Sequence, residues 1–363
     1  MPPVPLLLAG AGHAHLVTLQ RWRAEGYHAP VGSCLINPTA QAWYSGMLPG
    51  LLAGRWQAEQ CCIELAPLCA AVGVSLRLGE ITQLDANSQQ AQLADQSRIR
   101  WQWLSLGVGG APQAPAHNDH SITLLPAKPF AGLYQQCRTW QQQNAPQRLA
   151  IIGGGAAAVE LALALARLLP ATQLNLFSAG PLLAALPARA GNLVRPLLRQ
   201  RGISYHEGVT VTGIQNGQLW QDTQVIGAAD AALLASGNMA PHWLADSAMT
   251  CDATGAVRIQ PNLQSSSHPT VFATGDCASL SACPHNGVQA VRQGAVLAEN
   301  LSQVLCGDQA TRQFKPPRHS LALLATADEQ AIATRNGIAL RSRLALRLKD
   351  RLDNGFIRAI RGD

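Results

Sequence analysis

Residues 4–22 read VPLLLAGAGHAHLVTLQRW, and residues 149–169 read LAIIGGGAAAVELALALARLL. In each segment an apolar run precedes a glycine turn, and an apolar helical run follows it. A strand, a turn and a helix in this order bring backbone N–H groups and a helix N-terminus close to a pyrophosphate. One such fingerprint alone is weak, but two in the same context reinforce each other and predict two dinucleotide-binding domains.

The glycines of the two segments mark the turns at which a phosphate would be bound. Gly10 and Gly12 form the first turn, and Gly153 and Gly155 form the second. Because glycine lacks Cβ, the chain can turn tightly there and approach a ligand closely. Helices are predicted over residues 15–22 and 156–169, and further contacts are expected from His13, Ala14 and His15 in the first segment and from Ala156 in the second. His15 stands at the third glycine position, where a large side chain should press against the strand.

A third element lies near residue 270. Residues 270–276 read TVFATGD, which predicts a short strand that ends in Gly-Asp. The carboxylate of Asp276 can accept hydrogen bonds from the ribityl hydroxyls of a flavin, and Gly275 lets the flavin chain lie close to the backbone. The first of the two nucleotides is therefore expected to be FAD.

With these elements in this order, the chain resembles the two-dinucleotide flavoproteins of the pyridine nucleotide-disulfide oxidoreductase superfamily. The resemblance implies that FAD binds at Gly10 and Gly12, that NAD(P)H binds at Gly153 and Gly155, and that Asp276 holds the FAD ribitol.

Two further stretches narrow the resemblance. Residues 43–50 read WYSGMLPG and residues 284–293 read PHNGVQAVRQ. Both are similar to segments of a FAD/NAD(P)-binding flavoprotein group that is often fused to selenide, water dikinase. That group is similar in turn to type II NADH dehydrogenases and sulfide:quinone oxidoreductases. By this resemblance FAD also contacts Ser45, Gly46, Met47, Leu48, Gly287 and Val288.

The predicted fold is α/β, with two Rossmann-like, three-layer dinucleotide-binding domains and the NAD(P)-type domain inserted in the FAD domain. Residues 1–117 and 243–318 should form the FAD domain, and residues 118–242 the NAD(P)-binding domain. Residues 319–363 should form a C-terminal segment. A chain of 363 residues is long enough for two cores.

Two positions of the expected FAD site carry their own predictions. An acidic residue normally ends the second strand and binds the adenosine ribose. This chain has Asn37 there, whose amide can bond to a hydroxyl without a charge. Gly287 should open a helix whose N-terminal amides face the flavin and stabilise the anion of the reduced flavin.

The expected NAD(P)H site leaves the coenzyme open. Ser178 ends the second strand of that domain, where an acid would select NADH and a basic residue would favour NADPH. Ser236 and Gly237, just before the chain returns to the FAD domain, complete the site. Glu160 resembles a glutamate of type II NADH dehydrogenases that faces the nicotinamide and the flavin and relays protons. The alternative is an ordinary polar residue on an apolar helix.

Nine cysteines are present without a C-x-x-C or zinc spacing, and we expect no metal site. Disulfide reductases of the resembled superfamily carry a redox-active C-x4-C motif where this chain reads YSGMLP at residues 44–49. Electrons should therefore leave the flavin directly. Cys277 and Cys283 flank the flavin-side loop and raise the alternative of a sulfide- or selenide-handling enzyme; otherwise they are small packing residues.

The charge balance bears on partners and location. Only 13% of the residues are charged, and the formal net charge is +6. This positive excess suits anionic partners such as phosphates or acidic lipid. No basic and aromatic block resembles a nucleic-acid face, so no nucleic acid partner is expected. Residues 149–169 are interpreted as a nucleotide site and not as a membrane span. No signal peptide is visible, which predicts a cytoplasmic location.

Residues 340–363 predict a basic amphipathic helix. Apolar residues recur at every fourth position, namely Leu340, Leu344, Leu348, Leu352, Phe356 and Ile360. Positive charge comes from Arg341, Arg343, Arg347, Lys349, Arg351, Arg358 and Arg361. The helix can lie on the cytoplasmic face of a membrane, cover the FAD domain or form a homodimer face. Of these three possibilities we favour the one in which the apolar residues pack on the FAD domain, because Gly355 should interrupt the helix.

Together these features predict a FAD-dependent oxidoreductase that accepts a hydride from NAD(P)H and passes electrons to a quinone-like or other small acceptor. One alternative is a sulfide- or selenide-handling flavoprotein that uses Cys277 or Cys283. Another is a non-catalytic flavin-binding or partner module linked to selenium metabolism, because Asn37 and Ser178 depart from the usual pattern at functional positions.

Overall fold

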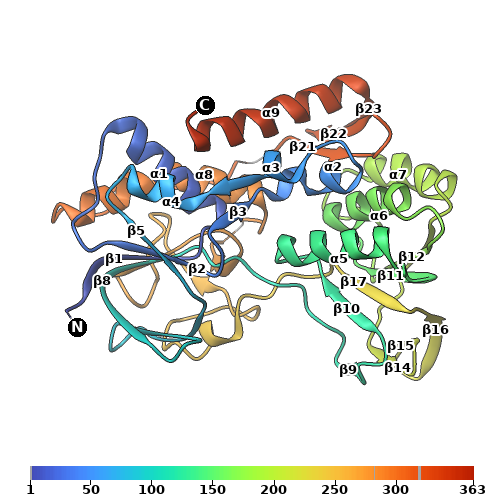
Figure 1. The fold of residues 1–363 in the computed structure, drawn as a ribbon, viewed down its shortest axis with the longest axis horizontal. Helices are drawn as coiled ribbons and strands as arrows, with labels where there is room; N and C mark the ends of the chain where they lie inside the picture. Colours follow the sequence, from blue (N-terminus) through green and yellow to red (C-terminus); the bar gives the residue numbers. More distant parts are fainter. Residues whose placement is uncertain (1, 282, 318–319) are drawn as a thin grey trace.

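The computed structural model describes residues 2–281, 283–317 and 320–363, and it contains one mostly parallel and one fully parallel sheet that each carry one glycine turn. A C-terminal helix, α9 (Arg343–Arg361), lies above them (Figure 1).

The first sheet has the strand order β5-β2-β1-β8-β7-β6, and β19 pairs with the half of β8 that β7 leaves free. Its strands are β1 (Val4–Ala9), β2 (Cys34–Asn37), β5 (Ser75–Leu78), β6 (Ile81–Asp85), β7 (Gln90–Leu93), β8 (Arg98–Leu106) and β19 (Val271–Ala273). The five strands β5, β2, β1, β8 and β19 run parallel. Leu6, Leu7 and Leu8 of β1 are fully buried, as expected for a central strand covered on both faces.

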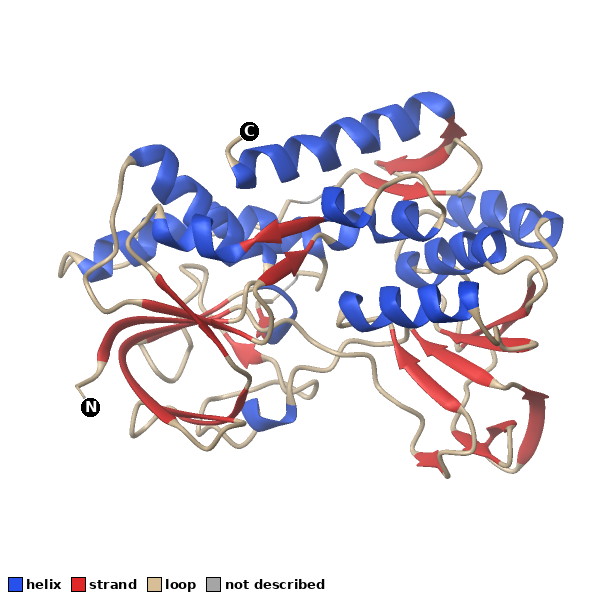
Figure 2. Ribbon diagram, viewed as in Figure 1, coloured by secondary structure: helices blue, strands red, loops and turns tan. Residues whose placement is uncertain are grey.

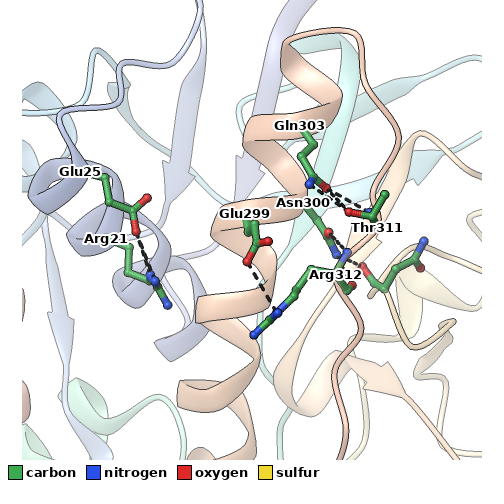
Figure 3. A network of polar contacts seen from close by, with 8 residues as sticks. Arg21, Glu25, Glu299, Asn300, Gln303, Thr311 and Arg312 are labelled. Carbon is green, nitrogen blue, oxygen red and sulfur yellow. Dashed lines mark hydrogen bonds and ion pairs between the residues drawn. The ribbon is translucent and has the colours of Figure 1, made fainter.

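Helices α1 (His13–Glu25) and α8 (Gly287–Leu305) pack against each other on this sheet. The indole Nε1 of Trp22 in α1 donates to Ala298 O of α8 at 3.1 Å. The chain after α8 is held to the same helix, because Arg312 N donates to Asn300 Oδ1 at 2.9 Å and Thr311 N donates to Gln303 Oε1 at 3.0 Å (Figure 3). These contacts fix the helix whose first turn reaches the site described below.

The second sheet is parallel throughout, with the order β10-β17-β11-β12-β13. Its strands are β10 (Thr123–Pro126), β11 (Arg148–Ile152), β12 (Gln173–Ser178), β13 (Ser204–Glu207) and β17 (Ala231–Leu234). All lie between β8 and β19 in the sequence. The second unit is therefore inserted in the first, as predicted.

The second unit has three layers. Helices α5 (Phe130–Gln142), α6 (Ala156–Leu168) and α7 (Ala188–Gln200) lie on one side of the sheet (Figure 2). The other side carries a small sheet of β9 (His117–Asn118), β14 (Gly213–Gln215), β15 (Gln218–Gln221) and β16 (Gln224–Ala228). Strand alternation builds both cores: Leu149 and Ile151 join the large core, whereas Ala150 and Ile152 face the small sheet.

Short elements complete the first unit. They are β3 (Gln41–Trp43), β4 (Cys62–Glu64), α2 (Leu48–Leu52), α3 (Ala58–Cys61), α4 (Leu65–Ala70), β18 (Val257–Arg258) and β20 (Ala278–Ser279), with single 3₁₀ turns at Ser45–Met47, His242–Leu244 and Gly275–Cys277. The 3₁₀ turn at Ser45–Met47 and helix α2 carry the WYSGMLPG stretch toward the second unit, where α2 contacts α6.

The C-terminal segment differs from its prediction at its start and at Gly355. It begins with an antiparallel sheet of β21 (Ala322–Ala325), β22 (Ala331–Arg335) and β23 (Ile338–Ser342), so Leu340 and Arg341 lie in a strand. The hydroxyl of Ser342 caps α9 by accepting from Ala345 N at 3.1 Å. Gly355 does not interrupt α9, which continues to Arg361.

The predicted leucine stripe does not cover the domain. Leu344, Leu348 and Leu352 are 71%, 42% and 51% exposed, whereas Leu346 and Ile357 are buried. An α-helix turns about 100° per residue, so a four-residue repeat drifts about 40° per step around the axis. The stripe therefore begins on the exposed side of α9 and reaches the buried side only near its end.

Candidate functional site

One cavity of about 2060 Å³ lies where the two units and the C-terminal segment meet. Most ligand sites enclose roughly 300–1,000 Å³, so this cavity has room for two ligands side by side. Its walls include the predicted residues His13, Ser45, Gly46, Leu48, Asp276, Gly287, Val288, Gly153, Gly155, Ala156, Glu160, Ser178, Ser236 and Gly237. The predicted residues Gly10, Gly12, Ala14, His15, Asn37, Met47 and Gly275 do not line it.

The first glycine turn is packed tightly against the end of β8. A Cβ on Gly10 would lie 2.7 Å from Gly107 O, and one on Gly12 would lie 2.5 Å from the same oxygen. Gly10 also has a φ of +81°, which favours glycine. No side chain caps α1, so the N–H groups of its first turn face outward for an anion. The turn itself therefore requires these glycines, and their contact with FAD stays a prediction.

His15 does not push the helix and strand apart as predicted. Its ring is fully buried, with Nδ1 2.6 Å from Gly10 O and Nε2 2.8 Å from Ser105 Oγ. A Cβ on Gly107 would lie 2.7 Å from the ring, so the missing side chain at Gly107 makes room for the imidazole. Burial lowers the pKa of His15 from 6.5 to about 4, and the ring is neutral.

Asn37 holds the first turn rather than facing an open site. Its Oδ1 accepts from Ala11 N at 3.0 Å, and its Nδ2 donates to Thr39 O at 2.8 Å. The amide thus supplies both a donor and an acceptor to the protein, which a carboxylate could not do. Its contact with the adenosine ribose stays a prediction.

Asp276 has a partner that sequence reasoning missed. Lys128, between β10 and α5, places its Nζ 2.5 Å from Asp276 Oδ2. Asn238 Nδ2 also donates to the Asp276 backbone oxygen at 3.3 Å, and Gly275 N donates to Gln293 Oε1 at 2.7 Å. Lys128 is 148 positions away in the sequence, so no local pattern could have paired it with Asp276.

The first turn of α8 offers unused polar groups to the cavity. Asn286 caps the helix by accepting from Gln289 N at 3.0 Å. The Gln289 side chain lines the cavity, is 2% exposed, and neither its Oε1 nor its Nε2 has a partner among the described residues. A buried amide without partners is costly. A ring edge that presents both an N–H and a carbonyl, such as the pyrimidine edge of a flavin, satisfies both atoms.

The second glycine turn leaves one position open. A Cβ on Gly153 would lie 2.4 Å from Ala235 O, but a Cβ on Gly155 would meet nothing within 4 Å. Gly155 lines the cavity and directly precedes α6, whose N-terminus no side chain caps. Backbone N–H groups are therefore free here to bind a phosphate.

Ser178 turns its hydroxyl to the protein. Ser178 Oγ donates to Gly180 O at 2.7 Å. On the neighbouring strand Glu207 is occupied by Arg195 at 2.8 Å and by Leu182 N. Ser178 has no charge that would favour NADH or NADPH, and its contact with a ribose stays a prediction.

Glu160 is half-buried and lies near a polar cluster of Tyr44, Lys349 and Asp353 that the sequence did not predict. Its Oε1 accepts from Ala325 N at 2.7 Å. Lys349 Nζ lies 3.0 Å from Asp353 Oδ2 and donates to Gly46 O at 2.8 Å, and Tyr44 donates to Asp353 Oδ1 at 3.1 Å. Lys349 is thus a cavity residue and not one of the surface charges of α9.

The pKa values of Glu160, Lys349 and Tyr44 are shifted from their usual values. Burial raises the pKa of Glu160 from 4.5 to about 7, although Lys349 opposes this shift. Burial alone would lower the pKa of Lys349, but Glu160 and Asp353 outweigh it and raise that pKa. Burial also raises the pKa of Tyr44. Glu160 therefore changes protonation near neutral pH while Lys349 stays charged.

An aromatic wall stands beside this cluster. The rings of Tyr44 and Phe356 stack with centroids 4.5 Å apart, and His13 lies 5.5 Å from Tyr44. Enclosure by its surroundings lowers the pKa of His13 from 6.5 to about 4, with Asp276 opposing the shift. The imidazole is therefore neutral and adds no charge to the cavity.

The cysteines give little support to thiol chemistry. Cys277 is fully buried, its thiol contacts Thr274 O at 3.2 Å, and burial raises its pKa to about 11. Burial also raises the pKa of Cys283. Neither residue lines the cavity. Over the described parts of the chain, no group of three or more His, Cys, Asp or Glu side chains could hold a metal ion.

Fold and site together define a two-dinucleotide α/β flavoprotein. The family model described as pyridine nucleotide-disulphide oxidoreductase matches residues 6–295, and the chain belongs to this family. It is accordingly an oxidoreductase with FAD and NAD(P)H as cofactors.

Relatives and solved structures agree with this assignment. A demethylphylloquinone reductase from Synechocystis is 25% identical, over 80% of this chain and 76% of that protein. An NADH dehydrogenase-like protein from Bacillus subtilis is 26% identical, over 64% of each. The fold is similar to that of a sulfide:quinone oxidoreductase from Aquifex aeolicus, with a TM-score of 0.79 at 16% identity over 99% of this chain and 92% of that one. A water-forming NADH oxidase from Lactobacillus brevis gives a TM-score of 0.73 at 19% identity, over 92% and 75%.

Proposed function

We propose that this enzyme takes a hydride from NAD(P)H and passes two electrons to a quinone-type acceptor. The observation that carries the proposal is the single cavity bordered by Gly155, Asp276 and Gln289, which brings the two expected nucleotide sites together. The similarity to a demethylphylloquinone reductase supports a quinone as the acceptor.

The chain's own groups would bind and orient the reactants. The N-termini of α1 and α6 would hold the pyrophosphates of FAD and NAD(P)H, with Gly10, Gly12, Gly153 and Gly155 allowing close approach. Gln289 and the first turn of α8 would hold the flavin ring edge and favour its reduced anion. The flavin, when bound, supplies the hydride acceptor.

Glu160 would act as a proton donor when the quinone is reduced. Reduction of a quinone to a quinol consumes two electrons and two protons. Glu160, with a pKa of about 7, can hold and release a proton near neutral pH. Lys349 and Asp353, which contact each other, lie close enough to influence that pKa. This arrangement supports Glu160 as a proton donor at the acceptor side of the site.

We further propose that α9 meets the surface of an anionic membrane, where quinones reside. Leu344, Leu348 and Leu352 are exposed, and Arg347 and Arg351 follow them on the adjoining side of the helix. Leu352 also lines the cavity, so the leucine face reaches its edge. Among the described residues, no helix combines the length and the apolar character needed to span a membrane.

Anaerobic titration tests the central proposal. NADH or NADPH should bleach the flavin absorbance, and a short-chain quinone should then restore it at one equivalent. A flavin that neither coenzyme reduces would contradict the proposal, and so would a reduced flavin that a quinone does not reoxidise.

Vesicle sedimentation tests the membrane contact. The protein should bind vesicles that contain anionic lipid, binding should weaken with added salt, and a Leu344→Glu/Leu348→Glu variant should lose it. Equal behaviour of variant and wild type would contradict the contact. A concentration-dependent dimer that the same variant abolishes would assign this face to self-association instead.

A further inference from the structure

Two of the chain's three lysines lie in the cavity, each beside a carboxylate. Lys349 contacts Asp353, and Lys128 contacts Asp276. The Lys349 pair belongs to the Glu160 cluster, whereas Lys128 has no part in the function proposed above. The third lysine, Lys315, is exposed.

The Lys128 pair joins the two units. Lys128 follows β10 of the inserted unit, whereas Asp276 follows β19 of the first unit. Lys128 Nζ lies 2.5 Å from Asp276 Oδ2, and Asn238, where the chain returns from the inserted unit, donates to the Asp276 backbone oxygen at 3.3 Å. Asp276 is therefore bonded both by a side chain inside the inserted unit and by the connection that returns from it.

The geometry leaves half of the carboxylate open. Oδ2 of Asp276 is engaged by Lys128, while Oδ1 makes no hydrogen bond within the described residues. The Asp276 side chain is 16% exposed and Lys128 is 38% exposed, so the pair is only partly screened by water. The nearby imidazole of His13 is neutral and cannot replace the lysine as a cation.

We propose that Lys128 is a positioning residue of the flavin site: it keeps Asp276 oriented with one oxygen free for the ribityl hydroxyls, and it makes FAD affinity depend on docking of the inserted unit. The inference rests on the proposed role of Asp276 toward FAD. A carboxylate without this partner can rotate, so its free oxygen is no longer fixed toward the ligand.

FAD titration of the flavin-free protein tests the proposal. Lys128→Met should raise the Kd for FAD about tenfold or more, in the range expected for loss of a charge-assisted hydrogen bond. Lys128→Arg should stay within about threefold of wild type, because it keeps the cation. Lys315→Met is the matched control and should leave the Kd unchanged.

A double-mutant cycle separates this inference from the assignment of Asp276. Asp276→Asn should itself weaken FAD, and adding Lys128→Met to it should change the Kd by less than about twofold, because the two residues act through one contact. If Asp276→Asn binds FAD normally, the role of Asp276 is wrong. If Asp276→Asn weakens FAD but Lys128→Met does not, only the inference about Lys128 fails. Equal losses in Lys128→Met and Lys128→Arg would also overturn it.

Discussion

The two glycine turns share a spacing but differ in what their glycines face. In the first turn, a Cβ on Gly10 or Gly12 would collide with the backbone of Gly107. In the second, Gly153 is similarly confined, but Gly155 faces open space at the cavity. The same motif thus contains glycines that the fold requires and a glycine that no neighbouring protein atom requires. Substitution should separate these two roles.

The largest effect is expected at Gly12. Gly12→Val places a branched side chain against the Gly107 carbonyl, and neither backbone can move freely, so stability should fall by about 3 kcal/mol or more. Denaturant unfolding of the flavin-free protein measures this loss. A Gly12→Val protein that folds with wild-type stability and merely binds FAD more weakly would show that this glycine, too, serves only the ligand.

Gly107 should be next. Gly107→Ala sets a Cβ 2.7 Å from the His15 ring and should cost about 1–3 kcal/mol. In a His15→Ala background the ring is gone, and the same change should cost much less. An equal cost in both backgrounds would mean that His15 and Gly107 do not accommodate each other.

Gly155→Val should leave folding and FAD content unchanged, because its Cβ meets nothing within 4 Å. The branched side chain should instead block the second pyrophosphate and raise the Kd of the pyridine nucleotide at least about tenfold, which is about 1.4 kcal/mol. Coenzyme titration monitored by flavin bleaching gives this value. Loss of flavin from this variant would refute the contrast between the two turns.

The smallest effect concerns Glu160, on the helix that follows the second turn. Its pKa is raised to about 7 from 4.5, so the folded state binds the proton more tightly, and Glu160 should lower stability as pH rises from about 4.5 to 7. Glu160→Gln should remove this slope from the difference between variant and wild type. It should also remove an inflection near pH 7 from the rate of quinone reduction. A rate profile that keeps its inflection would exclude Glu160 as the titrating group.

The helix α9 shows why one prediction from periodicity failed. A strict four-residue repeat looks like a buried stripe in the sequence, but it drifts around a helix of 3.6 residues per turn. The tertiary structure buries the face that carries Leu346, Asp353 and Ile357 instead. The sequence pattern groups Lys349 with the arginines of this helix, because nothing local distinguishes it from them.

The sequence by itself determined the elements that depend on neighbours along the chain: the strands β1 and β11, the glycine turns after them, the helices that follow these turns, and the insertion of one unit in the other. Only the tertiary structure decided which distant groups meet. Lys128 reaches Asp276, Lys349 and Asp353 reach Tyr44 and Gly46, and His15 fits against Gly107. The physical reason is that turn and strand propensities act over a few residues, whereas charge pairing and side-chain fit are set by the packing of whole elements.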